Sequence, residues 1–191
     1  RSEKLSEKEF IGGSKEHLKR VLIRYKHMEA YPRFFARFKI LCDPMFPRLS
    51  DFLKSPKKII DIGCGYGVPS SWLLELYPDA RIFAVEPDSS RAFIASKALG
   101  ASGEVVVASA PDLPSVLGKF DTAFLLDIIH YLNDEDLRKS LKWIRTHLIR
   151  NGRLIIRVTI PSAKRFPWER LLEYYRVRML KIDAYFRTGS E

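Results

Sequence analysis

Residues 57–67 read KKIIDIGCGYG, a short apolar run that ends in an acid and passes directly into a turn with glycine at every second position. Residues 58–62 have the apolar character of a strand that is buried on both faces. Gly63, Gly65 and Gly67 lack a Cβ, so the turn can adopt positive φ and a ligand can lie against its backbone. Pro69 suits the first turn of a helix. The sequence therefore predicts a strand, a ligand-binding glycine turn and a helix in direct succession.

The chain repeats this alternation of apolar runs and amphipathic stretches as far as residue 160. We expect further strands at residues 81–85, 104–108, 120–126 and 153–160, with helices at 68–77, 89–99 and 134–149. Asn151-Gly152 is expected to form the turn before the last strand. Apolar strands separated by helices are typical of a parallel sheet that is covered on both faces. We therefore predict an α/β fold over residues 57–160, a three-layer Rossmann-like sandwich with a mostly parallel sheet.

Glu86 ends the second predicted strand, about 20 residues beyond the glycine turn. A carboxylate at this position can accept hydrogen bonds from both hydroxyls of a ribose. A dinucleotide-binding turn would fit the same pattern, but that fingerprint places its third glycine one residue later, where Val68 stands. The pairing of Glu86 with the glycine turn indicates a nucleoside-containing ligand.

These features, together with SAPDLP at residues 109–114 and Phe120-Asp121-Thr122, resemble class I methyltransferases that depend on S-adenosylmethionine (SAM). The resemblance covers about residues 57–160 and implies SAM as the cofactor. It places the methionine end of SAM against residues of the strand end and the glycine turn, namely Asp61, Gly63, Cys64, Gly65 and Gly67. It places the ribose at Glu86, with Pro87 beside it.

Ser109 stands where that family usually has an acid for the adenine amine. The resemblance implies that the Ser109 hydroxyl and the Ala110 N–H contact the adenine instead.

Asp127 and His130 follow the fourth predicted strand, in the segment that lies between SAM and the acceptor in this family. Either side chain could accept a proton from an acceptor hydroxyl or amine, which makes both of them candidate catalytic residues. The alternatives are that Asp127 orients the SAM ammonium group and that His130 is a packed or solvated residue. Positioning alone can supply most of the acceleration of a methyl transfer, so a catalytic base is optional.

Residues 1–56 are predicted to form a basic N-terminal helical lid. Apolar residues recur at helical spacing on one face, and the face consists of Leu18, Val21, Leu22, Tyr25 and Met28. Pro32 is expected to break the helix, and residues 33–41 to form a second helix with aromatic and basic side chains. These helices either pack on the sheet domain as a lid or present a surface to a membrane or a lipid-like substrate.

The N-terminal segment resembles, more weakly, the lid of methyltransferases that are encoded with lipid or polyene acyltransferases and exporters. That resemblance implies that Tyr25 or Lys39 reaches the SAM carboxylate. It also implies that the phenylalanines of the segment wall an apolar acceptor pocket.

Residues 161–191 are expected to be a C-terminal helical segment of the same domain, with a helix at 168–181 and one edge strand at 180–186. The family ends its sheet with an antiparallel strand pair, and this stretch is short for such a pair. The uncovered sheet edge would be covered by a helix, by residues outside this chain or by a partner subunit in a homodimer.

The composition is globular, with 46% hydrophobic residues, and no apolar run reaches the roughly 18 residues of a membrane helix. Two cysteines argue against a disulfide framework and favour a reducing, cytoplasmic location. The histidine and cysteine spacing predicts no metal site. The formal net charge of +10 favours partners that carry phosphates, anionic lipid surfaces or an acidic carrier protein.

The function expected from these features is SAM-dependent methyl transfer to a small-molecule or lipid-like acceptor. The alternatives are an RNA methyltransferase, which the basic charge permits, and a non-catalytic SAM-binding or membrane-docking domain of a larger protein. Nucleic-acid bases are less favoured because the Asn/Asp-Pro-Pro-Tyr and Pro-Cys motifs of base methyltransferases are absent from the sequence.

Overall fold

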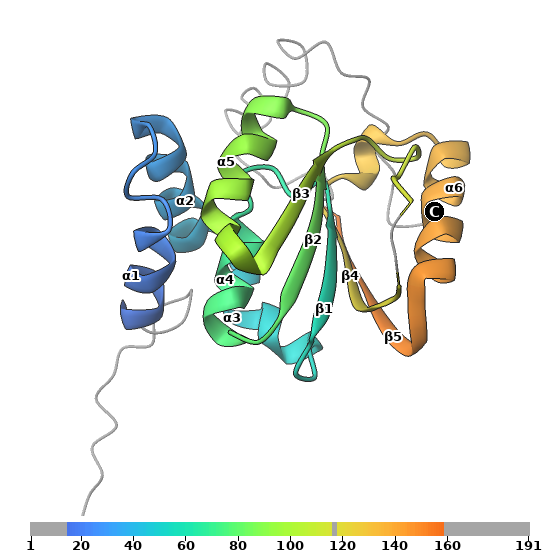
Figure 1. Cartoon of the computed structure of the whole chain (residues 1–191), viewed down its shortest axis with the longest axis horizontal. Coiled ribbons are helices and arrows are strands. Elements are labelled where there is room, and N and C mark those ends of the chain that lie inside the picture. The colour runs from blue at the N-terminus through green and yellow to red at the C-terminus, as the bar shows by residue number, and fades with distance from the viewer. Residues whose placement is uncertain (1–14, 116–117, 159–191) are drawn as a thin grey trace, which may run out of the picture.

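The computed structural model describes residues 15–115 and 118–158 and contains one five-stranded sheet (Figure 1). The sheet consists of β1 (Lys58–Ile62), β2 (Arg81–Glu86), β3 (Gly103–Val107), β4 (Phe120–Leu126) and β5 (Leu148–Arg157). Its strand order is β3-β2-β1-β4-β5, and every pairing is parallel. The predicted α/β Rossmann-like sandwich is confirmed.

Helices cover both faces of this sheet, as its apolar strands require. α4 (Val68–Leu76) and α5 (Ser89–Leu99) lie on one face, and α6 (Asp134–His147) lies on the other (Figure 1). Successive strand residues point to opposite faces, so Ile59 joins the core beneath α4 while Ile60 and Ile62 join the core beneath α6. Short 3₁₀ turns at Gly100–Ser102 and Ile129–Tyr131 follow α5 and β4.

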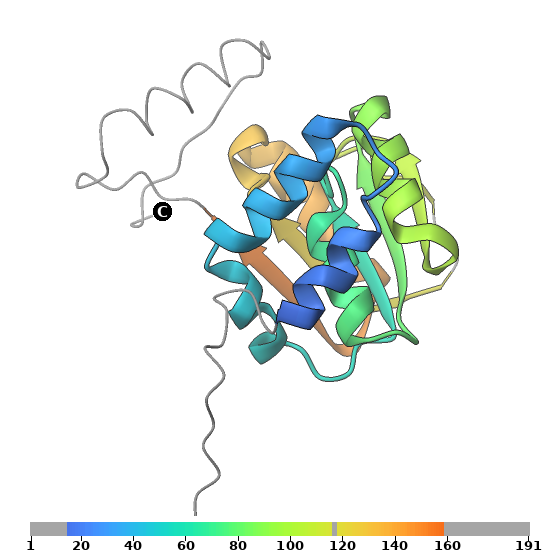
Figure 2. The ribbon, with the colours of Figure 1, turned by 90° about the vertical axis from the view of Figure 1, so that its left-hand side faces the viewer.

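The N-terminal helices form a further layer outside α4 (Figure 2). They are α1 (Lys15–Ile23), α2 (Ala30–Cys42) and α3 (Met45–Leu49), and a 3₁₀ turn follows at Ser50–Phe52. Val21 of α1 and Ala36 and Ile40 of α2 are fully buried in one core cluster with Trp72 of α4. The N-terminal helices therefore share the core of the sheet domain.

Two predicted boundaries were wrong. Pro32 does not break a helix, because it lies in the first turn of α2, where its missing N–H needs no partner. β5 begins at Leu148 instead of residue 153, and α6 ends at His147. The expected turn at Asn151-Gly152 is an irregularity within β5, whose pairing shifts from Phe120↔Leu148 to Thr122↔Arg153.

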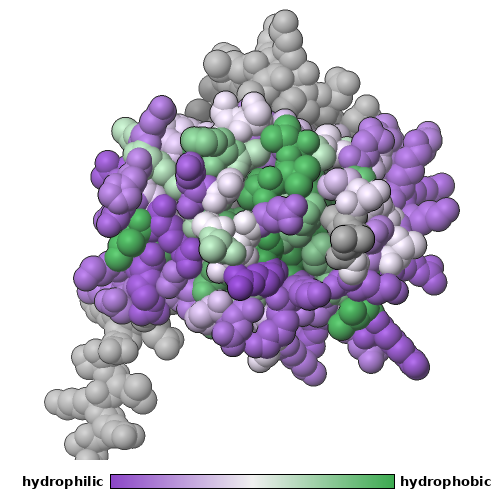
Figure 3. Space-filling view, in the orientation of Figure 1, coloured by the Kyte–Doolittle hydropathy of each residue, from purple (hydrophilic) through white to green (hydrophobic). Residues whose placement is uncertain are grey.

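The side of the molecule in Figure 3 carries hydrophilic side chains over α6 and an apolar area between α5 and α6. The connection between β3 and β4 contributes no helix in its described residues, so this part of the sheet is less covered. Among the described residues, no helix is long and apolar enough to cross a membrane. The helix and strand predicted within residues 161–191, and the last residues of the strand predicted at 153–160, lie outside the described residues.

Candidate active site

The glycine turn has a left-handed backbone at all three glycines, with φ of +79° at Gly63, +58° at Gly65 and +72° at Gly67. A Cβ on Gly63 would lie 2.4 Å from Cγ2 of Ile128, and one on Gly67 would lie 3.1 Å from Cβ of Ala95. A Cβ on Gly65 would meet no heavy atom of the described residues within 4 Å. Gly63 and Gly67 are therefore needed because neighbouring side chains leave too little room for a Cβ. The backbone of Gly65 instead faces open space, where a ligand can approach.

Asp61 lies at the carboxyl end of β1, and only 1% of its surface is exposed. The Ser70 hydroxyl donates a hydrogen bond to Oδ2 of Asp61 at 2.6 Å. Burial raises the pKa of Asp61 to about 6, the charge of Glu86 adds to this increase, and the Ser70 hydrogen bond opposes it. A cation that reached Asp61 would stabilise its ionised form.

Glu86 is the last residue of β2, and its side chain is hydrogen-bonded to the glycine turn that follows β1. The Gly65 N–H donates to Oε2 of Glu86 at 2.8 Å, and the Asp88 N–H donates to Oε1 at 3.2 Å. Each carboxylate oxygen can accept more than one hydrogen bond, so both retain capacity for a ligand. Within the described residues, neither Asp61 nor Glu86 forms an ion pair. The structure thus brings two uncompensated acids to one glycine turn.

Cys64 and Pro87 lie inside these two segments. Cys64 is buried, and its thiol donates to the Gly65 carbonyl at 3.6 Å. Burial raises the pKa of the Cys64 thiol, so this residue stays protonated. Pro87 is exposed beside Glu86.

Tyr25 supports the turn from the α4 side. Its hydroxyl donates to the Tyr66 carbonyl at 2.9 Å and lies 3.1 Å from Oγ of Ser71. The ring is 1% exposed, and burial raises the pKa of the phenol. The Tyr25 hydroxyl is therefore hydrogen-bonded to the backbone of the glycine turn. Its contact with the SAM carboxylate stays a prediction.

A second group of charges lies at the carboxyl ends of β4 and β5. Asp127 follows β4 with φ of +58°, and its Oδ2 lies 3.2 Å from Nη1 of Arg157 and 3.7 Å from Nζ of Lys39. The same two cations bind Oδ2 of Asp43, at 2.5 Å from Arg157 and 2.7 Å from Lys39. We call these four residues the charge cluster. It joins the end of α2 to the strand ends beside the glycine turn.

Asp43 is the most buried member of the charge cluster, with 6% of its side chain exposed. Burial acts to raise the pKa of Asp43, but hydrogen bonds from Arg157, Lys39 and the Met45 N–H outweigh burial and lower it. The cluster contains two cations and two anions, so it carries no net charge.

His130 is buried at 7% exposure within the 3₁₀ turn after β4, and its ring centroid lies 4.0 Å from that of Tyr131. Ser109 and Ala110 follow β3 at the same carboxyl edge of the sheet. Ser109 is exposed, and its hydroxyl donates to the Ala110 carbonyl at 3.2 Å. The roles of His130 as a base and of Ser109 and Ala110 at the adenine stay predictions.

A family model described as a methyltransferase domain matches residues 59–152, about half of the chain. The matched range contains the whole glycine turn, Glu86 and Asp127, and it covers the parallel sheet as far as the first half of β5. The chain belongs to the class I SAM-dependent methyltransferases. SAM is the cofactor that this family uses.

Individual relatives agree with this methyltransferase assignment. A malonyl-acyl-carrier-protein O-methyltransferase of Legionella pneumophila is 32% identical over 108 residues, which make up 56% of this chain and 38% of that protein. The chain thus spans little more than a third of the length of this curated relative.

Two solved structures show the methyltransferase fold. One is a plantazolicin methyltransferase in complex with a pentazolic desmethylPZN analogue and SAH, with a TM-score of 0.58, 17% identity, and coverage of 84% of this chain and 68% of that one. The other is an O-methyltransferase family protein of Burkholderia thailandensis, with a TM-score of 0.58, 18% identity, and coverage of 88% of this chain and 53% of that one.

Sequence reasoning missed several residues that shape this candidate site. Asp43 and Arg157 are 114 positions apart, and no local pattern connects them. Ser70 could have been found, because it lies in the first turn of the helix that follows the glycines and nine residues after Asp61. The structure also shows that Lys39 faces Asp127, whereas the Tyr25 hydroxyl faces the Tyr66 carbonyl.

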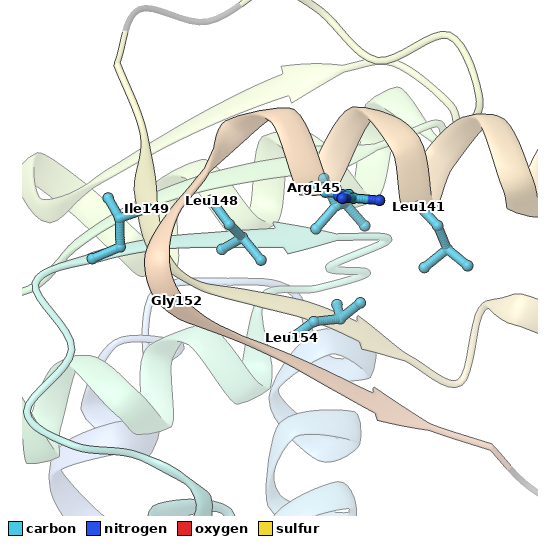
Figure 4. A pocket seen from close by; sticks show the side chains of 7 residues that line it. Leu141, Arg145, Leu148, Ile149, Gly152 and Leu154 are labelled. Atoms are coloured by element: carbon cyan, nitrogen blue, oxygen red, sulfur yellow. The ribbon is translucent and has the colours of Figure 1, made fainter.

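Two shallow pockets of about 300 Å³ lie away from the candidate site. The first lies between the end of α6 and the start of β5, where Leu141, Leu148 and Leu154 form its apolar wall beside Arg145 (Figure 4). Leu148 pairs with Phe120 at the amino end of β4, so this pocket lies at the sheet edge opposite the glycine turn. The second lies between α1 and α2. In the part of the chain that the structure describes, no group of three or more metal-ligating side chains is close enough to hold a metal ion.

Proposed function

We propose that this chain binds SAM across the glycine turn and catalyses transfer of its methyl group to a small-molecule or lipid-like acceptor. The observation that carries the proposal is the pair of acids at one turn: Asp61 and Glu86 form no ion pair among the described residues, and Gly65 donates its N–H to Glu86 at 2.8 Å. SAM carries a sulfonium and an ammonium group against one carboxylate. A buried site with two uncompensated acids therefore favours this cation.

The residues present fit each part of SAM. Asp61 would accept from the ammonium group, and the exposed backbone of Gly65 would lie against the methionine end. Glu86 would accept from the ribose hydroxyls with the lone pairs that its two backbone donors leave. Ser109 and the Ala110 N–H would contact the adenine from the end of β3. When bound, SAM supplies a methyl group on a cationic sulfur.

Asp127 and His130 are the candidate groups on the acceptor side. Asp127 is held by Lys39 and Arg157, so a hydrogen bond from an acceptor hydroxyl would meet a carboxylate of fixed orientation. His130 is the alternative base for the same proton. An acceptor carboxylate has no proton to lose and would need only to be positioned.

An oxygen acceptor is supported by the curated relative, which is named an O-methyltransferase of a malonyl-carrier substrate. The small or lipid-like class is supported by two aromatic side chains of α2, the exposed Tyr31 and the half-buried Phe35, whose rings lie 6.1 and 5.1 Å from the Tyr66 ring. Aromatic walls of this kind suit an apolar acceptor.

Calorimetric titration of the purified chain with SAM and with S-adenosylhomocysteine tests the proposal, with NAD as the control ligand. We expect micromolar binding of both and none of NAD. Failure of both ligands to bind would overturn the proposal for this chain.

Turnover is then measured with radiolabelled SAM, by offering malonyl-carrier protein, free fatty acids and RNA as acceptors in parallel. Labelling of an apolar or carrier-bound acid supports the proposed acceptor class. Labelling of RNA alone would replace that class with RNA methylation. SAM binding with no labelled product in any acceptor would instead favour a non-catalytic SAM-binding domain of a larger protein.

His130→Ala separates the two explanations for this histidine. A base role requires that turnover falls while SAM affinity is retained. Equal losses in both would show that His130 contributes packing only.

A further inference from the structure

α1 and α2 lie side by side on the side of the molecule that faces the viewer in Figure 2. Their exposed residues are both apolar and basic. We call this surface the outer face and define it by Ile23, Lys26, Arg33, Phe34, Arg37 and Phe38. The three apolar members are 49%, 65% and 55% exposed for Ile23, Phe34 and Phe38 respectively. Phe34 and Phe38 are adjacent, and Ile23 lines a groove with Arg37 of α2. Exposed apolar side chains that gather in this way indicate a binding surface.

The buried and the exposed apolar residues of α2 lie on opposite sides of the helix. Pro32, Ala36 and Ile40 are buried against the domain, whereas Phe34 and Phe38 lie four residues apart on the opposite side, with their rings stacked at 6.0 Å. Arg33 and Arg37 have the same spacing on the flank of α2 that faces α1. The aromatic pair is therefore directed outward and is bordered by cations.

The charges of the outer face are not compensated by any acid in residues 15–115 and 118–158. Arg20, Arg24 and Lys39 of the same segment form ion pairs with acids. Within the described residues, no such pair is formed by Lys26, Arg33 or Arg37. The positive potential of the outer face is therefore free to act on an anionic partner.

A shallow groove between the two helices completes the outer face. Its floor consists of Leu18, Leu22 and Ile23, and its rim carries Lys19, Lys26 and Arg37 around a volume of about 300 Å³. An apolar floor below basic side chains matches a lipid, whose acyl chain is apolar and whose headgroup phosphate is anionic.

We propose that the outer face docks this protein on an anionic lipid bilayer. Phe34 and Phe38 enter the boundary between headgroups and acyl chains, and Arg33, Arg37 and Lys26 reach the phosphates with their long side chains. A protein partner fits less well, because the centres of protein interfaces are depleted of charged residues, whereas here cations alternate with apolar residues within two helical turns.

Docking would place the proposed site beside the membrane. Tyr31 and Phe35, on the other flank of α2, contact the Tyr66 ring of the glycine turn. A lipid-like acceptor could then pass from the bilayer to the carboxyl edge of the sheet without crossing water. This last step depends on the proposed function, but the docking itself does not.

The test is flotation of the full chain with vesicles of phosphatidylcholine alone and of two parts phosphatidylcholine to one part phosphatidylglycerol. The double variants Phe34→Ser/Phe38→Ser and Arg33→Gln/Arg37→Gln are compared with the wild-type chain. One matched control is Phe52→Ser, which changes an exposed phenylalanine in the 3₁₀ turn before β1. The other is Arg138→Gln/Lys142→Gln, which removes from α6 two charges at the same spacing. Unchanged thermal unfolding shows that each variant is folded.

We expect partition onto the anionic vesicles only, and a loss of about tenfold or more in each outer-face variant. The control variants should partition as the wild-type chain does. Raising the ionic strength to about 0.15 M should weaken partition of the wild-type chain more than that of Arg33→Gln/Arg37→Gln.

Three results would overturn the proposal. The first is that the wild-type chain does not partition onto anionic vesicles. The second is that the α6 control loses as much partition as the outer-face variants. The third is that the wild-type chain binds an acidic acyl carrier protein, the outer-face variants do not, and no chain binds vesicles. None of these measurements uses SAM. Failure of the SAM titration with vesicle binding intact would therefore reject the proposed function alone.

Discussion

The acids at the two halves of the carboxyl edge of the sheet have opposite kinds of partner. At the glycine turn, the donors to Asp61 and Glu86 among the described residues are all neutral, namely the Ser70 hydroxyl and backbone N–H groups. In the charge cluster, Asp43 and Asp127 are bound by Lys39 and Arg157. The first half retains negative charge for a cationic ligand, whereas the second half has already neutralised its own.

The difference shows that a buried acid can serve either binding or architecture, depending on its donors. Neutral donors orient a carboxylate without cancelling its charge, so the cost of burial remains and a ligand can relieve it. Cationic donors remove that cost and leave a structural connection between segments that are far apart in the chain. Variants of the two halves should therefore fail in different assays.

The largest effect is expected from Asp43→Ala in the charge cluster. Its removal leaves Arg157 and Lys39 with only Asp127, so we expect the free energy of unfolding to fall by about 2 kcal/mol. This is less than for a fully buried pair, because both cations are partly exposed. Urea unfolding measures the loss, and SAM affinity should stay unchanged. Asp51→Ala, an exposed acid in the 3₁₀ turn before β1, is the control and should have little effect.

Asp61→Ala and Glu86→Ala should each weaken SAM binding at least tenfold, or about 1.4 kcal/mol, because each removes one of the acids at the glycine turn. Calorimetry measures the change, and Asp79→Ala, an exposed acid at the other end of the sheet, should bind as the wild-type chain does. Unchanged affinity in both variants would end the assignment of this half to the cofactor.

The pH dependence of SAM binding should report Asp61. Its pKa is raised to about 6 in the free protein, so a cationic ligand must displace a proton below that value. Affinity should therefore fall about tenfold between pH 7 and pH 5, a change of about 1.4 kcal/mol. Asp61→Asn should lose this dependence. A wild-type affinity that does not vary with pH would show that Asp61 does not meet a cation.

Stability should change with pH in the opposite direction. The raised pKa means that the contribution of Asp61 to folding is present below the unfolded value, near 4, and is lost as pH rises through about 6. Asp61→Asn should accordingly gain thermal stability relative to the wild-type chain at pH 7 and not at pH 4.

The smallest effect is expected from Tyr25→Phe, which removes one donor to the Tyr66 carbonyl and leaves the buried ring in place. We expect a loss of about 1 kcal/mol in unfolding free energy. A severalfold loss of SAM affinity should accompany it, because the turn loses support. Tyr77→Phe, outside the turn, is the matched control. A stability loss without any change in affinity would show that Tyr25 does not hold the turn in its binding geometry.

The sequence predicted the local structure of the glycine-turn half well because its residues are close together in the chain. Residues 57–67 carry the strand, the acid and the turn together, and Glu86 follows one helix later in the same motif. The order of strands and helices also followed from periodicity, since the central strands β1, β2 and β4 are apolar and largely buried on both faces. Local patterns of this kind depend on backbone conformation and burial, which neighbouring residues largely determine.

The charge cluster could not be predicted in this way. Asp43 lies at the end of α2 and Arg157 at the end of β5, and only the packing of α2 across the strand ends brings them together. The boundary errors have a related cause. Pro32 was predicted to break a helix, but it lies in the first turn of α2. Asn151-Gly152 was predicted to form a turn, but it lies within β5, whose pairing with β4 is irregular at this point.

Tyr25 sets a limit on how the site can exchange its ligand. Its hydroxyl joins the N-terminal segment to the backbone of the glycine turn, and Val21 beside it is completely buried. Lifting α1 would break this bond and expose core side chains, an event of microseconds or longer. Tyr31 is 63% exposed, and its ring can rotate in nanoseconds. Product release should therefore proceed by rotation of aromatic side chains on α2 while the helices stay in place.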